Sequence, residues 1–576
     1  MQGISHQEAL AGRGFVKVAA PHPTTLIQPI PTTVDEWYFG TIQCARGPVS
    51  IYLWITDLSF VTAPNVYLQQ RPDWLVGWRP HLIRRALEYL CYSDHEIYQL
   101  LAHRPDRAIL RVLQDSKETL DRIADPATVV EDSKREFALL WPAQLRKVVI
   151  DIEVSSRLER VQVYSCDDPI YKSVFLVSHD PRLLAKKLGL TGPVIPNHWA
   201  VIYPEGAQQM YLTEKGPPVN LREVAIWLRE TKADAWPAWS AFWLLPKNYH
   251  EVRYHFFRSR GQLVGLFVDA AAKYMRSVKT ARDVKRFLAH KLWGQDSIPV
   301  IRLGIDRLDD GYLVSRNLEE GSRGLQGVRI LLIGGGAIGS YLAQALMQIG
   351  AGSKHGQTQG TFTICDRDSL SAENLGRHLL GMEYLGKNKA EALKAHLLKL
   401  RPGLSIEVIP SSFSAASFEG YDLVVDASGY EVFSRYASYL ARQGKLHWLE
   451  KDGKALLNVW IAGQGGVVRT LLQDSPKAAC FDCLFNFNET TEAILRHPPY
   501  TDSKWESHGS DGYATMTPFS VSAPLAASAL AVDTVLAWRN GKPSPRLRSR
   551  RVEGEGIAAP VSKDIERVAK CPTCCR

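Results

Sequence analysis

The sequence predicts a multidomain α/β protein whose last part is a doubly wound parallel sheet. The chain has 576 residues, which is too long for a single hydrophobic core. From about residue 330 onward, short apolar runs alternate with helical patterns. The glycine-rich stretch ILLIGGGAIGS, residues 330–340, opens this alternation. Strands that alternate with helices in this way favour a parallel sheet covered on both faces.

Three blocks follow one another along the chain. Residues 1–142 combine strand-like runs with helical patterns and are predicted to form an α+β domain. Residues 143–300 are predicted to form a second α+β domain that links the two ends, and residues 301–576 hold the alternating α/β pattern. In the middle block we expect strands at KVVIDIEV, RVQVYS, SVFLVS, HWAVIY and QMYLTE.

Composition excludes several classes of protein. The 69 basic and 60 acidic residues give a net charge of +9, which is mild for this length, and no dense Lys/Arg run predicts binding to nucleic acid. The N-terminus lacks the apolar core of a signal peptide, and every long apolar stretch is interrupted by polar residues. Nine cysteines, four of them in C-x-x-C pairs, favour a metal site in a reducing compartment. We therefore expect a cytoplasmic protein without membrane or nucleic-acid partners.

The glycine turn predicts a phosphate-binding loop. Gly334, Gly336 and Gly339 have the spacing at which bare backbone approaches phosphates at a helix N-terminus. In a nicotinamide-binding fold, an acid about 20 residues further on holds the ribose. Here Asp366 ends the second strand, 30 residues after Gly336, and an inserted loop explains the longer gap.

The residues that follow Asp366 favour a nucleoside triphosphate. Arg377 and Lys389 supply two cations, and Asp426 ends a later strand. Cations near a triphosphate neutralise charge when the α-phosphoryl group is attacked and pyrophosphate leaves. A nicotinamide oxidoreductase would leave both cations without a role.

The same segment resembles the ThiF-type adenylyltransferases, the superfamily that includes ubiquitin-activating enzymes. The resemblance covers about residues 310–576 and implies that ATP and Mg²⁺ bind here. It implies that Asp366 holds the ribose, that Asp426 holds the magnesium, and that Gly429 stands where the family often has a second acid. The motif D-x-D-x(5)-N-x-x-R, followed by G-x-x-K, reads Asp366, Asp368, Asn374, Arg377, Gly386 and Lys389, of which Asn374, Arg377 and Lys389 are expected to contact the phosphates.

Two cysteine pairs predict a structural zinc site. Cys480 and Cys483 form one C-x-x-C knuckle, and Cys571 and Cys574 form another near the C-terminus. Four thiolates in two knuckles are the ligand set of a closed tetrahedral zinc site. Similar ThiF-type proteins carry such knuckles, which implies that Zn²⁺ clamps the C-terminal tail to the domain. Cys575 would be a ligand if the register were shifted by one residue.

Many activating enzymes transfer the adenylated tail to a cysteine of their own. The corresponding loop here, HPPYTDSKWESHGSDGYATMTP, contains no cysteine, and a C-x(7)-P pattern ending at Pro518 places Ser510 at the nucleophile position. Three options remain open: no covalent step, an oxyester at Ser510 with His508 as a nearby base, or direct transfer to a thiol elsewhere. An ordinary polar loop serine is equally compatible with the sequence.

Cys91 in the first block is the candidate thiol. This block resembles ubiquitin-conjugating enzymes, because a strand meander leads into a proline-bearing segment and His81 stands ten residues before Cys91. The resemblance implies that Cys91 carries an acyl group as a thioester. The family's His-Pro-Asn tripeptide is absent, and Ile83 falls at the asparagine position. An inert core position for Cys91 is the alternative.

The three blocks together resemble bacterial fusion proteins of anti-phage operons, which combine activation with conjugation. The resemblance implies ATP-dependent adenylation of the C-terminal carboxylate of a ubiquitin-like protein or another protein tail. Transfer to Cys91 and conjugation to a lysine of a target would follow. ThiF-type domains pair, which implies a homodimer. The alternatives are a sulfur-carrier adenylyltransferase and a catalytically inactive nucleotide-binding adaptor.

Overall fold

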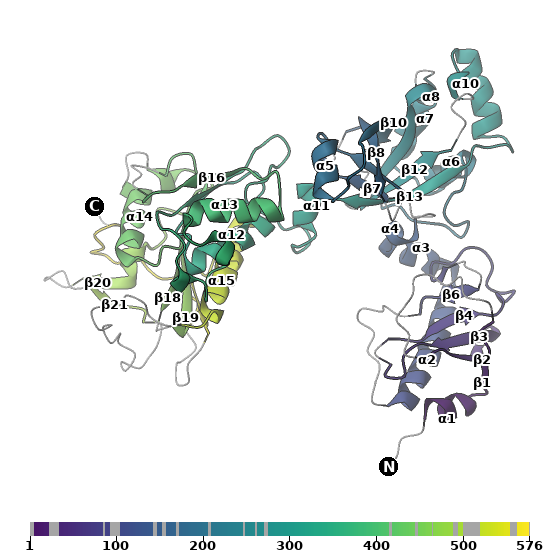
Figure 1. Ribbon diagram of the computed structural model, residues 1–576, viewed down its shortest axis with the longest axis horizontal. Helices are drawn as coiled ribbons and strands as arrows, with labels where there is room; N and C mark the ends of the chain where they lie inside the picture. The colour runs from purple at the N-terminus through teal and green to yellow at the C-terminus, as the bar shows by residue number, and fades with distance from the viewer. Residues whose placement is uncertain are drawn as a thin grey trace. The chain divides into compact units, whose positions relative to one another are not determined.

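The contacts divide the chain into two compact units, residues 1–150 with 154–306 and residues 307–576 with 151–153. The first two predicted blocks pack together in the first unit, and the third block makes up most of the second (Figure 1). The computed structural model describes residues 5–21, 34–60, 62–83, 87–92, 104–141, 147–152, 157–168, 172–204, 209–245, 248–259, 262–269, 275–413, 418–443, 447–462, 465–487, 493–498, 519–552 and 561–574.

The first block is an antiparallel sheet with helices. Its strand order is β1-β2-β3-β4-β6-β5, and helix α2 packs against β2. The apolar spacing of RAILRVLQDSKETLDRI predicts a long helix, and the structure confirms it as α2. A similar pattern in HEIYQLLAHR also predicts a helix, but most of that segment falls outside the described residues. The strands are β1 Val16–Val18, β2 Glu36–Cys44, β3 Gly47–Ile55, β4 Asn65–Leu68, β5 Leu82–Ile83 and β6 Glu88–Leu90, and the helices are α1 His6–Ala11, α2 Pro105–Ile123, α3 Pro126–Arg135 and α4 Phe137–Leu140.

The middle block is built around a closed seven-stranded barrel. The strand order is β10-β11-β12-β13-β7-β9-β8. The strands are β7 Lys147–Ile150, β8 Glu159–Asp168, β9 Lys172–Val177, β10 Ile195–Ile202, β11 Val252–Ser259, β12 Gln262–Val268 and β13 Val300–Arg307. The helices are α5 Pro181–Lys187, α6 Leu221–Glu230, α7 Ala235–Phe242, α8 Asn248–Glu251 and α10 Ala281–Phe287, followed by the π-helix η1 Leu288–Leu292.

The end of the first block packs into the core of the barrel domain. Phe137 and Trp141 are fully buried in the same hydrophobic cluster as residues of α6, α7 and the barrel strands. The indole of Trp141 donates to the carbonyl of Gly265 at 2.8 Å, and Arg302 donates to the carbonyl of Trp141 at 2.8 Å. These contacts explain why the two blocks form one compact unit.

The strand predicted at QMYLTE is wrong. Residues 209–214 have no strand, although Met210 and Leu212 are buried as a strand pattern would require. Side chains satisfy part of this backbone, because the amide of Met210 donates to the Ser259 hydroxyl and the amide of Leu212 to the Ser133 hydroxyl. An alternating pattern indicates that every second residue is buried, and here that burial occurs without a strand.

The second unit is the doubly wound α/β domain that the sequence predicts. Its sheet has the order β16-β15-β14-β17-β18-β19-β22, parallel from β16 to β18 and antiparallel beyond. The strands are β14 Arg329–Ile333, β15 Thr361–Cys365, β16 Ile406–Ile409, β17 Leu423–Asp426, β18 Ala455–Ala462, β19 Val467–Gln473 and β22 Leu547–Arg551, with a separate hairpin of β20 Phe485–Phe487 and β21 Ala493–Leu495. The helices are α11 Asp310–Ser315, α12 Ala337–Gln348, α13 Lys389–Leu400, α14 Glu431–Gln443 and α15 Ser522–Arg539, with 3₁₀ turns η2 Ala372–Asn374, η3 Met382–Tyr384, η4 Trp448–Glu450 and η6 Phe481–Leu484.

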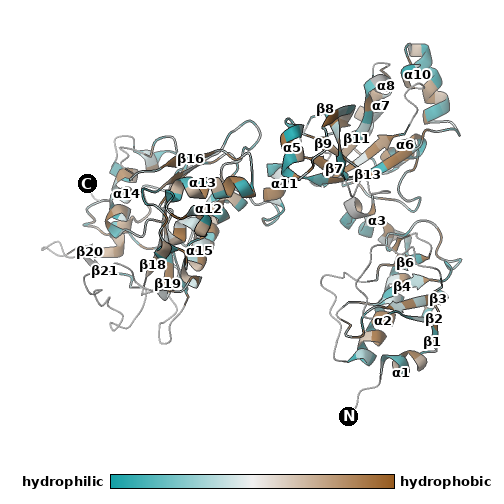
Figure 2. Ribbon diagram, in the orientation of Figure 1, coloured by the Kyte–Doolittle hydropathy of each residue, from teal (hydrophilic) through white to brown (hydrophobic). Residues whose placement is uncertain are grey.

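Alternate residues of each strand bury opposite faces of this sheet. Ile330 and Leu332 of β14 lie in the core shared with α12, α13 and α15, whereas Leu331 and Ile333 lie in the core shared with α14. The helices carry hydrophobic and hydrophilic residues side by side, as expected for helices with one buried face (Figure 2). Within the described ranges, no helix is both long enough and apolar enough to cross a membrane.

The barrel domain buries a histidine that should make its stability depend on pH. His255 is enclosed by aromatic rings and contacts the hydroxyl of Tyr203 at 2.9 Å. Burial lowers the pKa of His255 from its ordinary 6.5 to about 3. The unfolded chain therefore binds a proton as the pH falls below 6.5, whereas the folded protein does not until about pH 3.

We predict that the first unit loses stability as the pH falls from 6.5 toward 3. At about 1.4 kcal/mol per pH unit, His255 would account for a loss of roughly 2 kcal/mol by pH 5. In His255→Phe, the midpoint of thermal unfolding should fall less between pH 7 and pH 5 than in the parent protein. Replacement of the exposed His179 by Phe is the control, and a parental pH slope in His255→Phe would contradict the prediction.

Candidate functional site

A pocket of about 480 Å³ lies at the carboxyl ends of the parallel strands in the second unit. The strand order reverses between β14 and β17, and open α/β sheets bind ligands at such a switch point. The walls come from the ends of β14, β15 and β17 and from α13 and α14. The predicted residues Gly334, Gly336, Asp366, Asp368 and Lys389 all line this pocket.

The three glycines of the turn have different roles. Gly334 has a φ of +96°, and a Cβ there would lie 2.8 Å from backbone atoms of Ala427. Gly336 is the N-cap of α12 and faces open space, so its backbone is accessible from the pocket. A Cβ on Gly339 would meet the carbonyl oxygen of Gly334 at 1.8 Å, so this glycine lets α12 pack closely on the turn. Only the first two line the pocket.

Asp366 fixes the conformation of the turn. One carboxylate oxygen of Asp366 accepts the amide of Gly335 at 2.6 Å, and the other accepts the amide of Asp368 at 2.7 Å. The Lys389 amine lies 3.6 Å from the Asp368 carboxylate and is nearly buried at the start of α13. These contacts place one cation and two acids around the glycine turn.

The side chains of Asn374 and Arg377 both have partners within the protein. The side chain of Asn374 accepts the amide and hydroxyl of Ser371 in a capping box at 3.1 and 3.2 Å. The guanidinium of Arg377 stacks over the ring of Phe519 at 4.8 Å. Neither residue is among the described walls of the pocket, so their contacts with phosphates stay predictions.

Asp426 is buried beneath the pocket rather than on its surface. Its carboxylate accepts hydrogen bonds from Ser428 at 2.7 and 3.1 Å, from Ser434 at 2.5 Å and from Asn458 at 3.1 Å. Burial raises the pKa of Asp426. An ion that contacted Asp426 would have to replace one of these bonds, so the structure favours a role in fixing the end of β17. Gly429, with a φ of +68°, suits a backbone turn at this point.

Two features of the pocket were missed from the sequence. His378 accepts the amide of Leu380 at Nδ1, so its Nε2 donates to the carbonyl of Gly335 at 2.7 Å and holds the turn from behind. The one sequence feature that could have indicated His378 is its position directly after Arg377 of the motif. The second feature is an aromatic wall, and these side chains have no characteristic spacing in the sequence: they are Phe413, Tyr430, Phe433 and Tyr436.

The four knuckle cysteines converge, as the spacing predicts. Their sulfur atoms all lie within 4.8 Å of one another, and neighbouring pairs are 3.5 to 3.8 Å apart. A tetrahedral zinc with bonds of about 2.3 Å requires sulfur–sulfur distances of roughly 3.8 Å, and a disulfide about 2.05 Å. The amide of Cys574 also points at the sulfur of Cys571 at 3.4 Å. The geometry therefore fits a metal ion better than disulfides; Cys575 lies outside the described residues.

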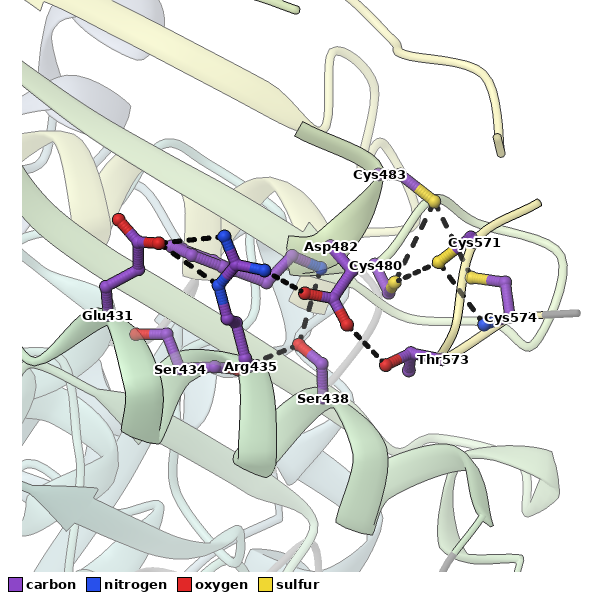
Figure 3. Close-up of polar contacts among 11 residues, drawn as sticks. Glu431, Ser434, Arg435, Ser438, Cys480, Asp482, Cys483, Cys571, Thr573 and Cys574 are labelled. Carbon is purple, nitrogen blue, oxygen red and sulfur yellow. Dashed lines mark hydrogen bonds and ion pairs between the residues drawn. The ribbon is translucent and has the colours of Figure 1, made fainter. Parts of the chain in front are cut away.

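Polar contacts connect the cysteine cluster to α14 (Figure 3). Arg435 of α14 donates to Asp482 at 3.0 Å, and the other oxygen of Asp482 accepts the hydroxyl of Thr573 at 2.6 Å. Thr573 lies between two of the cysteines, and Ser434, one residue before Arg435, holds Asp426. The C-terminal knuckle is thus attached to the helix that forms one wall of the pocket.

Cys91 lies in a second pocket, within the first unit. It follows β6, is half-buried, and lines a cavity of about 830 Å³. Its amide donates to the carbonyl of His81 at 2.9 Å, so the predicted pair is joined through the backbone. The ring of His81 is buried and lies 3.0 Å from Asp132. Ser510 and His508 lie outside the described residues.

Comparisons with known proteins match either most of the second unit or nearly the whole chain. Residues 312–551 match the ThiF family. The chain is similar to the ATP-dependent ubiquitin transferase-like protein Cap2 of Pseudomonas aeruginosa, with 28% identity over 94% of this chain and 95% of the relative. The Cap2 protein of Escherichia coli is 26% identical over 93% of each chain. The crystal structure of E. coli MccB with ATP aligns with a TM-score of 0.33 and 17% identity over 43% of this chain and 68% of that one.

The resemblance to a bacterial fusion protein with a ThiF-type part is therefore confirmed. The resemblance of the first block to ubiquitin-conjugating enzymes stays a prediction.

We predict that the purified protein contains about one zinc ion per chain, measured by elemental mass spectrometry. Cys480→Ser and Cys571→Ser should each lose the metal and lower the unfolding midpoint of the second unit by at least about 5 °C, because metal binding contributes folding free energy. Cys166→Ser is the control, since Cys166 donates to the carbonyl of Gly192 far along the chain from the cluster. Full zinc content in both cluster variants would refute the assignment.

Proposed function

We propose that this protein uses ATP to activate the C-terminal carboxylate of a ubiquitin-like protein or another protein tail. The acyl group then passes to Cys91 and from there to a lysine of a target protein. The observation that carries the proposal is the pocket at the β14–β17 switch point, where the glycine turn, Asp366 and Lys389 lie together. Near-full-length similarity to ATP-dependent ubiquitin transferase-like proteins supports the same activity.

The pocket residues suit a nucleotide substrate. The backbone of the glycine turn and the N-terminus of α12 would bind phosphates, because both offer amide groups. Each oxygen of Asp366 accepts one internal hydrogen bond and keeps a lone pair for a ribose hydroxyl. The aromatic side chains of Phe413 and Tyr436 provide a surface for the base. Lys389 would neutralise charge that develops on the phosphates.

The acids at the pocket fit a magnesium ion bound together with the triphosphate. Asp368 has an exposed carboxylate in the pocket, whereas Asp426 would have to exchange its bond with Ser428 for the ion. Mg²⁺, when bound, supplies positive charge beside the phosphates.

The proposed chemistry has three steps. The tail carboxylate attacks the α-phosphorus of ATP, the bond to the β-phosphate breaks, and pyrophosphate leaves. In the direct route, the Cys91 thiolate attacks the acyl carbon of the adenylate and AMP leaves. In the oxyester route, the Ser510 hydroxyl first displaces AMP, and the Cys91 thiolate then displaces the Ser510 oxygen. An amine then attacks the thioester, and the cysteine is released. A homodimer and a role in antiviral defence stay predictions that rest on the family resemblance.

The proposed role of Cys91 in acyl transfer distinguishes this proposal from a sulfur-carrier adenylyltransferase and from an inactive adaptor. A sulfur-carrier adenylyltransferase would share the nucleotide pocket and the zinc site but would have no use for a cysteine pocket in the first unit. An inactive adaptor would bind nucleotide without forming any covalent product. The cavity of about 830 Å³ beside Cys91 favours transfer, because an acceptor needs space next to the thioester.

We predict that a Cys91→Lys variant, tagged and expressed in its native cells, captures the activated protein. The acyl group would form a stable amide with the introduced amine, and intact-mass analysis would show an adduct that resists hydroxylamine. The mass identifies the donor. A labile adduct that maps to Ser510 would locate an earlier oxyester step. No adduct, with ATP and candidate tails present, would refute transfer to position 91.

We predict that Lys389→Ala in the Cys91→Lys background abolishes the adduct or reduces its rate by about 10²-fold or more. The variant would lack the cation that stabilises charge during adenylation. Lys399→Ala is the matched control, because Lys399 lies on the same helix but is exposed and pairs with Glu383 at 3.2 Å. Equal adduct yields in the two double variants would show that Lys389 has no part in activation.

A further inference from the structure

The cavity beside Cys91 has walls from two domains. The first block contributes Trp78, Ile83 and Cys91 itself. The barrel domain contributes further lining residues, including Pro217 and Val219. The middle block therefore forms part of the surroundings of the proposed thioester, in addition to linking the two ends of the chain.

Specific contacts fix the barrel side of the cavity against the first block. The amide of Trp78 donates to the carbonyl of Glu214 at 2.7 Å, and the buried guanidinium of Arg79 lies 3.2 Å from the Glu214 carboxylate. Gly216, with a φ of +77°, packs so closely that a Cβ would lie 2.7 Å from the Trp78 side chain. Ser133 of α3 exchanges two hydrogen bonds of 3.0 Å with the backbone of Leu212. These contacts hold the lining residues of the barrel domain in place beside the first block.

Most charged side chains of the cavity are already held by protein groups. Arg71 pairs with Glu88, Glu214 with Arg79 and Lys215 with Glu230, while Glu223 accepts the amide of Val219, and Arg302 donates to the carbonyls of Trp141 and Pro218. These groups offer little to a charged ligand.

Glu136 differs from the other acids. It caps the end of α3 and precedes α4, yet its side chain makes no capping hydrogen bond. Among the described residues, its carboxylate has no hydrogen bond or ion pair, and it lines the same cavity as Cys91. Its amide donates to the carbonyl of Asp132 at 3.0 Å. Glu136 thus lies one helical turn after Asp132, which contacts the ring of His81. The carbonyl of His81 in turn accepts the amide of Cys91.

We propose that this cavity is the acceptor site and binds the lysine side chain of the target protein. The aliphatic part of the lysine would lie against Trp78, Leu140 and Val219, and the ammonium would contact Glu136. The proposal rests on the function proposed above and adds that the middle domain helps to select the acceptor. The negative charge of Glu136 favours a cationic amine, and the apolar lining favours a flexible apolar chain that carries it.

The transfer balances with the groups in the cavity. The ammonium gives one proton to the Glu136 carboxylate, and the neutral nitrogen attacks the acyl carbon of the thioester. The carbon–sulfur bond then breaks, and the Cys91 thiolate takes the second proton from nitrogen. The products are an amide and a thiol, and Glu136 returns its proton to water.

The test measures discharge of the Cys91 thioester formed with the donor that the Cys91→Lys adduct identifies. Nα-acetyl-lysine and hydroxylamine are the two acceptors. Glu136→Gln should load normally, discharge to Nα-acetyl-lysine on the order of 10-fold more slowly with a raised apparent KM, and discharge to hydroxylamine at the parental rate. Glu131→Gln is the matched control, because Glu131 is an exposed acid of α3 outside the cavity.

A second variant tests the barrel wall. Val219 is half exposed, so Val219→Arg should fold, narrow the cavity and repel an ammonium. We expect normal loading and slow discharge to Nα-acetyl-lysine. Parental discharge in both variants, with loading intact, would overturn the acceptor site and leave the proposed function standing. Loss of loading in Val219→Arg would also overturn it, since the cavity would then hold the donor tail. Absence of a thioester in the parent protein would refute the proposed function itself.

Discussion

The contact between Gly334 and the end of β17 is the constraint on which the nucleotide pocket depends. The strand order reverses between β14 and β17, so the connections that leave their ends must diverge for a pocket to exist. Gly334 makes the turn within 2.8 Å of the backbone of Ala427, where no side chain fits. This turn directs the amide of Gly335 to Asp366 and starts α12 at Gly336. A larger residue at position 334 would displace the turn, the acid and the helix together.

The sequence predicts the residues of this site that lie at the ends of strands or at the starts of helices. Gly334 and Asp366 each lie at or just after the end of a parallel strand, and Lys389 begins a helix, so the fold alone brings them together. Asn374 and Arg377 are different, because Ser371 and Phe519 offer them partners within the protein. Motif spacing reports which residue types are present, whereas the direction of a long polar side chain depends on which neighbours compete for it.

The first unit was harder to predict for a related reason. Its barrel pairs strands that do not follow one another in the sequence, such as β7 with β9 and β10 with β8, and period-two patterns carry no information about strand partners. The ten-residue separation of His81 and Cys91 carried only the family resemblance, and in the structure the two residues share a backbone hydrogen bond. The His81 ring faces Asp132 instead. No local sequence motif predicts that Val219 lines the same cavity as Cys91.

Placing the acceptor cavity in the first unit separates two kinds of selection. The groups proposed to activate the tail, Asp366 and Lys389 among them, all lie in the second unit. Every residue of the Cys91 cavity lies in the first. Under the proposed function, changes at Pro217 or Val219 would therefore alter which amine is accepted without changing the adenylation pocket. In the proposed reaction, covalent linkage of the two units would keep the Cys91 thiol at high effective concentration relative to the activated tail. With the proposed acceptor site in one unit and the proposed adenylation pocket in the other, substitutions could change the accepted amine while the adenylation chemistry stays the same.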